Sequence, residues 1–71
     1  MAHILVSDPN NRLSSKESQQ EAIEAIKKMF PLPLMVQKNS GSIFHYKGFH
    51  LWFHASKDAP ADSFKGFSFP V

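Results

Sequence analysis

Three histidines and the only tryptophan lie close together in the sequence, at His45, His50, Trp52 and His54. If the chain turns at residues 47–48, His45 faces His50 across a strand pair, with Cβ atoms about 5 Å apart. Two imidazoles at that distance can share a metal ion such as Zn²⁺. A third ligand is missing, because His54 lies about 13 Å beyond His50 along an extended strand. We therefore expect a polar histidine pair without a metal or other cofactor, and metal binding by this pair stays an open alternative.

The chain contains no arrangement of residues typical of an active site. His54, Ser56 and Asp58 are neighbours in sequence, but no Gly-x-Ser-x-Gly turn presents a serine nucleophile, and no carboxylates are paired for acid–base catalysis. The three glycines are isolated from one another, so no glycine-rich loop can hold a phosphate. We therefore expect a protein that is not an enzyme.

The segment Lys47-Gly-Phe-His-Leu-Trp-Phe53 resembles the first ribonucleoprotein signature of RNA-recognition motifs, Lys-Gly-Phe-Gly-Phe-Val-x-Phe. Residues 4–6 take the place of the second signature, and the resemblance covers roughly residues 3–64. It implies binding to single-stranded RNA or DNA, with Phe49 turned outward to stack on a base.

The segment departs from that family at the positions that contact nucleic acid. His50 replaces a small residue, Leu51 replaces the second stacking aromatic, and Leu5 stands where the first strand carries an aromatic. The strand register that we derive below also turns Phe49 inward and Trp52 outward. Nucleic-acid binding is therefore the alternative function, in which Trp52 stacks and nearby lysines attract phosphate.

A protein-docking surface is the function that the pattern favours. Alternation along the expected strands places one set of side chains on the sheet face away from the helix: Met35, Gln37, Ile43, His45, His50, Trp52 and His54. Lys47 at the adjoining turn adds a positive charge. A tryptophan among polar neighbours is typical of the centre of a protein interface. The open edge of the sheet offers a second route, by backbone pairing with a partner or with a second copy as a homodimer.

The charge distribution indicates the chemistry of the partner. No acidic residue lies between Glu24 and Asp58, and the whole net charge of +2 comes from the part of the chain after Phe30. We therefore expect a macromolecular partner with an acidic or mixed surface. Small, cysteine-free chains without catalytic residues are a common form of stoichiometric regulators, including inhibitors encoded by phages and mobile elements, and we expect such a regulator here.

The first half of the chain predicts a strand and a helix. Residues 4–6 form a short apolar run that ends at the turn residues 8–11, as in a brief buried strand. Ser14 and Glu17 have the spacing of a capping box, and apolar residues then recur at helical spacing up to Phe30. Pro31 prevents the helix from continuing.

The second half predicts antiparallel strands. Residues 39–41 suit a three-residue hairpin loop that pairs residues 34–37 with residues 43–46, and residues 47–48 suit a two-residue turn into residues 49–53. The two turns together place these side chains on the face beneath the helix: Leu34, Val36, Phe44, Tyr46, Phe49, Leu51 and Phe53. Residues 67–71 form a short final strand, with the alternative that this segment covers Trp52.

The fold class that follows is α+β, with one α-helix packed on a small antiparallel β-sheet in the order β-α-β-β-β and a short C-terminal strand. The 71 residues make a single domain, 1–71, and the lack of cysteine excludes disulfides. No basic N-terminal region precedes residues 4–6, and the longest apolar stretch is broken by Pro31 and Pro33. We therefore expect no signal peptide, no membrane contact and a cytoplasmic location.

Overall fold

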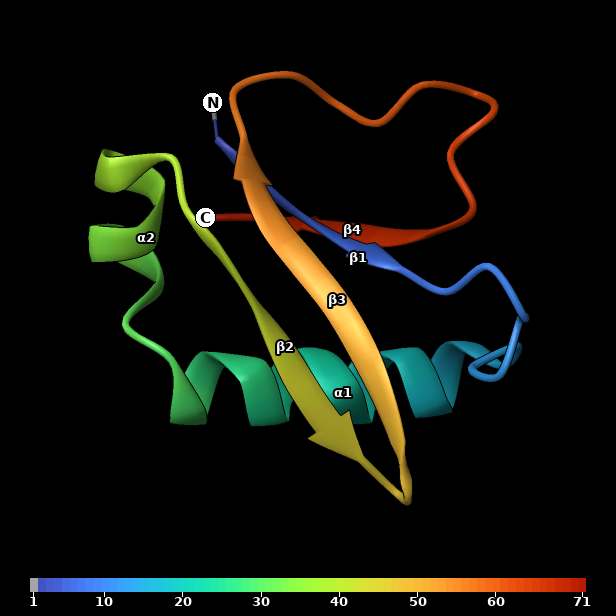
Figure 1. The fold of residues 1–71 in the computed structure, drawn as a ribbon. Coiled ribbons are helices and arrows are strands. Elements are labelled where there is room, and N and C mark those ends of the chain that lie inside the picture. The colour runs from blue at the N-terminus through green and yellow to red at the C-terminus, as the bar shows by residue number, and fades with distance from the viewer. Residues whose placement is uncertain (1) are drawn as a thin grey trace.

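The computed structural model describes residues 2–71 and has an α+β fold in which helices pack on an antiparallel sheet (Figure 1). Its elements in chain order are β1 (His3–Ser7), α1 (Lys16–Met29), α2 (Leu32–Lys38), β2 (Gly41–Tyr46), β3 (Phe49–Ser56) and β4 (Gly66–Pro70). The sheet covers one side of α1, and in Figure 1 strands β2 and β3 cross in front of that helix. We call the sheet face toward α1 the inner face and the opposite one the outer face.

Helix α1 forms where the apolar spacing predicts it, with a different cap. Ser15 rather than Ser14 is the N-cap, and its hydroxyl accepts a hydrogen bond from the backbone N–H of Ser18 at 3.1 Å. Glu17 lies in the first turn and two lysines lie in the last, as the helix dipole favours. The buried face of α1 consists of Ala22, Ile23 and Ile26.

The prediction of a strand at residues 34–37 is wrong, because these residues belong to helix α2. Pro33 fits the first turn of a helix, where its missing N–H costs no hydrogen bond. Leu32 and Met35 are three residues apart and are both buried. Asn39 then adopts the left-handed conformation at φ 52°, and its N–H donates to the carbonyls of Met35 and Val36. Residues 39–41 therefore lead from the end of α2 into β2 and are not a hairpin loop.

The four strands lie in the order β2-β3-β1-β4, and all neighbours are antiparallel. It follows that β1 runs parallel to β2, with β3 between them, so that α1 and α2 form the connection across the sheet. The expected C-terminal strand is confirmed as β4, which pairs with β1. At this end of the sheet the backbone N–H of Val71 donates to the carbonyl of Ala2 at 3.0 Å.

The β2–β3 hairpin has the predicted turn and register. Lys47 and Gly48 have φ of 49° and 87°, the two positive values that a type I′ turn requires. Across the hairpin, His45 pairs with His50 and Phe44 pairs with Leu51. The inner side chains Phe44, Leu51 and Phe53 form the centre of the core, and the Phe30 ring contacts Phe53 edge-on at 4.9 Å between centroids.

The loop between β1 and α1 is organised by a buried carboxylate. Asp8 is only 5% exposed, and its two oxygens accept hydrogen bonds from the backbone N–H groups of Arg12 and Leu13, each at 2.9 Å. Its own backbone N–H donates to the carbonyl of Lys65 at 2.9 Å, which connects this loop to the start of β4.

No helix within residues 2–71 is long and apolar enough to cross a membrane.

Candidate docking surface

The outer face gathers the histidines and the tryptophan. Because side chains alternate along each strand, the strand residues that point away from α1 include His3, Leu5, Ser7, Ile43, His45, His50, Trp52, His54 and Ser68. All four histidines of the chain are in this set. The predicted outward direction of Ile43, His45, His50, Trp52 and His54 is confirmed.

An apolar pair lies on the outer face at the β2 side of the sheet. Trp52 and Ile43 are direct partners in the β2–β3 register, and they are 53% and 47% exposed. Both side chains are therefore accessible, and the C-terminal segment pairs with β1 instead of covering Trp52. Leu5, the next apolar side chain on this face, is only 7% exposed between its register partners His54 and Ser68. We define the docking surface as Trp52 and Ile43 together with the histidines of the same two strands, His45, His50 and His54.

The two opposed histidines of the hairpin contact each other. The His45 and His50 rings lie with centroids 4.2 Å apart and an angle of 63° between their planes. In residues 2–71, no group of three or more His, Asp or Glu side chains is placed to hold a metal ion. A metal at this pair would therefore have two protein ligands, fewer than the three or four of ordinary zinc sites.

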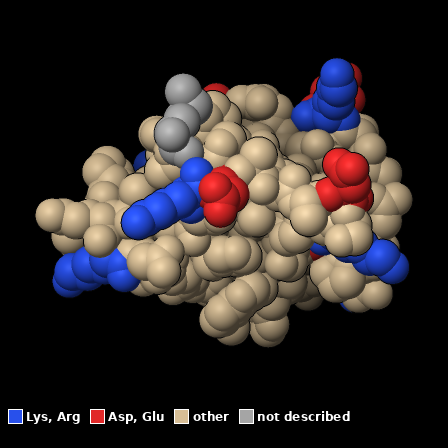
Figure 2. Space-filling view, turned by 90° about the horizontal axis from the view of Figure 1, so that it is seen from above, with Lys and Arg blue, Asp and Glu red and all other residues tan. Residues whose placement is uncertain are grey.

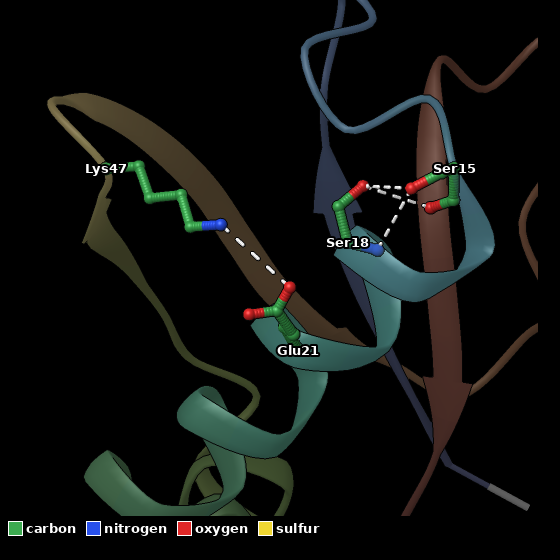
Figure 3. A network of polar contacts seen from close by, with 4 residues as sticks. All are labelled: Ser15, Ser18, Glu21 and Lys47. Atoms are coloured by element: carbon green, nitrogen blue, oxygen red, sulfur yellow. Dashed lines mark hydrogen bonds and ion pairs between the residues drawn. The ribbon is translucent and has the colours of Figure 1, made fainter.

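Three of the residues expected on this surface lie elsewhere: Met35 and Gln37 are on α2, and Lys47 is at the tip of the hairpin. Met35 is 8% exposed and belongs to the core, because it is carried by α2 and not by a strand. Lys47 lies at the tip of the hairpin and extends toward α1, where its Nζ is 3.9 Å from a carboxylate oxygen of Glu21 (Figure 3). The same Nζ lies 5.2 Å from the centre of the Tyr46 ring, on the inner side. The lysine therefore does not place its charge among the outer histidines.

Phe49 points inward, as the register predicts and in contrast to the RNA-recognition signature. Its ring packs edge-on against Tyr46, with centroids 6.0 Å apart. The guanidinium of Arg12 covers it, with Cζ 4.9 Å from the ring centre. The aromatic that would stack on a base in that family is thus occupied within the protein, and Trp52 is the aromatic that the sheet exposes.

The outer face contains no carboxylate among the side chains that its strands present. The glutamates Glu17, Glu21 and Glu24 are all on α1, behind the sheet. Figure 2, which views the molecule from above, shows lysines and acids beside one another with broad neutral areas between them. Among the side chains that the strands present on the outer face, only the imidazoles can therefore carry a positive charge.

A shallow groove lies at the other side of the hairpin, between α1 and β2. It has a volume of about 390 Å³ and is lined by Glu21, Glu24, Ala25, Lys28, Tyr46 and Lys47. Charges of both signs meet there, and the groove does not connect with the outer histidines.

His3 is the outer-face histidine that sequence reasoning missed. The alternation of β1 could have revealed it, because burying Ile4 and Val6 on the inner face turns His3, Leu5 and Ser7 outward.

No protein-family model, curated protein or solved structure was found to match this chain. The function is therefore argued from the geometry of the surface.

Proposed function

We propose that this protein is a non-enzymatic binding module that docks its outer sheet face on a protein partner and acts as a stoichiometric regulator or inhibitor. The observation that carries the proposal is the exposed Trp52–Ile43 pair, 53% and 47% exposed, on a sheet face whose strands present no acidic side chain. A tryptophan beside an aliphatic side chain, surrounded by polar groups, has the composition of an interface centre.

The chemistry of the surface indicates what the partner presents. The indole and Ile43 need an apolar pocket or ridge, since burying them in water-excluding contact supplies most of the affinity. The histidines around them donate hydrogen bonds to carboxylates or carbonyls and repel cations when protonated. A protein surface with an apolar centre and an acidic or mixed rim fits both requirements.

The test compares two variants that each remove one exposed apolar side chain. Immobilised protein is used to capture partners from nuclease-treated extract, and each captured protein is then purified and titrated. Trp52→Ala should weaken binding by about 2 kcal/mol or more, a loss of roughly thirtyfold in affinity. Met29→Ala is the matched control, because Met29 is 65% exposed but lies on α1. Equal binding by wild type and Trp52→Ala would exclude the proposed surface.

Single-stranded nucleic acid is the second candidate, and one observation favours it. Trp52 is exposed on β3, a central strand of a four-stranded antiparallel sheet with helices behind it, which is the platform that RNA-recognition motifs use. The inward Phe49 and the turned-away Lys47 reduce stacking area and phosphate attraction on that platform. Protein therefore remains the favoured partner.

Salt dependence separates the two candidates. Affinity for a labelled single-stranded oligonucleotide would fall steeply between 50 and 200 mM salt if phosphate contacts dominate. We expect only weak binding to the oligonucleotide at either salt concentration. Tight, salt-sensitive binding that Trp52→Ala removes would replace the protein-docking proposal with nucleic-acid binding.

A further inference from the structure

The sheet has two open edges, which differ in the backbone N–H and C=O groups that are available to an added strand. Strands β2 and β4 are the outermost strands, on opposite sides of the sheet (Figure 1). An edge strand presents every second residue's N–H and C=O groups to a further strand, and most proteins block such edges with proline, charge or a bulge. The hydrogen bonds at the ends of each strand show which residues face outward.

The β4 edge is blocked. The carbonyl of Lys65 accepts from Asp8, and the N–H of Val71 donates to Ala2, so the odd-numbered residues of this segment face β1. By alternation, Gly66, Ser68 and Pro70 turn their backbone groups to the open edge. Proline has no N–H, so one of the three outward positions cannot donate to an added strand.

The β2 edge is not blocked. The carbonyl of Ser40 accepts from the N–H of Ala55 on β3, so the even-numbered residues of this segment face β3. Gly41, Ile43 and His45 then turn their N–H and C=O groups to the open edge. The register with β3 is continuous over Gly41–Tyr46, so the strand has no bulge, and it contains neither proline nor lysine. Neither the register nor the sequence of β2 therefore blocks pairing with a further strand.

We propose that β2 pairs antiparallel with β2 of a second copy of this chain, about a twofold axis at Ile43. In that register, Ile43 lies opposite Ile43, and His45 lies opposite Gly41 of the second copy. Gly41 has no side chain, and a Cβ there would lie 2.6 Å from the carbonyl oxygen of Phe53, so the chain's own packing keeps this position a glycine. Because Gly41 has no side chain, this position presents none that would meet the His45 imidazole of the second copy.

The dimer joins two docking surfaces into one. The two sheets become a single eight-stranded sheet, because each copy contributes four strands. Across the new interface the exposed side chains follow in the order Trp52, Ile43, Ile43, Trp52 on the outer face. This inference rests on the backbone of β2 and goes beyond the proposed function, which needs only one copy.

Analytical ultracentrifugation of the full chain over a range of concentrations tests the inference. We expect a monomer–dimer equilibrium in the wild type and a monomer for Ile43→Pro, which removes the outward N–H without touching the bonds to β3. Ser68→Pro is the matched control at an outward position of β4 and should still dimerise. A monomeric wild type at all concentrations, or a dimer that persists in folded Ile43→Pro, would overturn the proposal.

Cysteine cross-linking provides a second measurement in a chain that has no cysteine of its own. At a twofold hydrogen-bonded pair the two Cα atoms lie about 5.5 Å apart, within disulfide range. Ile43→Cys should therefore form a covalent dimer at least about tenfold faster than Ser68→Cys, owing to the high effective concentration of the paired thiols. Equal rates for the two variants would contradict pairing through β2.

Discussion

The Asp8 carboxylate is the one buried charged side chain in the described part of the structure. It holds the loop before α1 by accepting from Arg12 and Leu13, while its backbone N–H contacts Lys65. The Asp-Pro-Asn-Asn sequence predicts a turn, but it does not reveal that both carboxylate oxygens serve as acceptors. That role depends on the later residues folding back over the carboxylate.

Replacing this carboxylate should destabilise the fold. Asp8→Ala leaves two backbone N–H groups without their acceptors, and we expect a loss of about 2–3 kcal/mol in the free energy of unfolding. Asp8→Asn retains one oxygen and should lose less. Urea titration followed by circular dichroism measures both variants. A change below about 0.5 kcal/mol for Asp8→Ala would show that the loop does not depend on the carboxylate.

Lys47 occupies a conformation that suits asparagine better. At φ 49°, the first turn position strains most side chains, and asparagine tolerates it with the least cost after glycine. The contact of Lys47 with Glu21, at 3.9 Å between exposed groups, is worth little. We therefore expect Lys47→Asn to raise the free energy of unfolding by about 0.5 kcal/mol.

The control for this variant is Lys57→Asn, which removes the same charge from an exposed loop position with no positive φ. It should leave the thermal midpoint unchanged, whereas Lys47→Asn should raise it by a few degrees. Equal midpoints for the two variants would mean that the turn carries no strain.

At the scale of elements, the sequence predicts those parts whose local signals agree with one another. Helix α1 has capping residues, periodic apolar residues and Pro31 as its end, and the β2–β3 register follows from its two-residue turn. Residues 34–37 carry conflicting signals. Their alternating pattern suits a strand, but burial of Leu32 and Met35 against the core and the left-handed Asn39 make them a helix. The secondary structure of such a short segment is determined by its tertiary contacts.

Two neighbouring residues of α2 test this assignment. Met35 is 8% exposed, and Met35→Ala should cost about 2–4 kcal/mol because it leaves a cavity in the core. Leu34 is 46% exposed, and Leu34→Ala should cost less than about 1 kcal/mol. Chemical denaturation of the two variants compares them directly. A larger loss of stability for Leu34→Ala than for Met35→Ala would contradict the helix and support the predicted strand, in which Leu34 faces the core.

The whole molecule is a thin body of two layers, with principal extents of 28 × 27 × 17 Å. The helices and the inner face of the sheet bury each other, and within residues 2–71 no second layer of secondary structure covers the outer face. Stability therefore resides on one side of the sheet, and the residues available for contact lie on the other. This division of the two faces was predictable from alternation, whereas the placement of Met35 and Lys47 was not.

The division predicts losses of stability of different size for adjacent residues of β3. Leu51 is 2% exposed on the inner face, and Leu51→Ala should lower the free energy of unfolding by about 2–5 kcal/mol. Trp52→Ala should lower it by only about 0.5–1 kcal/mol, from the lost contact with Ile43. Thermal unfolding followed by far-ultraviolet circular dichroism measures both. A loss for Trp52→Ala as large as that for Leu51→Ala would place the indole in the core.

Because the chain has one tryptophan and that indole is half exposed on the outer face, the unlabelled protein carries its own optical reporter. Its emission should resemble that of an indole in water and should be quenched readily by acrylamide. A partner seated on the outer face would move the emission to shorter wavelength and shield it from the quencher. Pairing through β2 leaves the ring in solvent, so a single titration distinguishes a bound partner from a second copy.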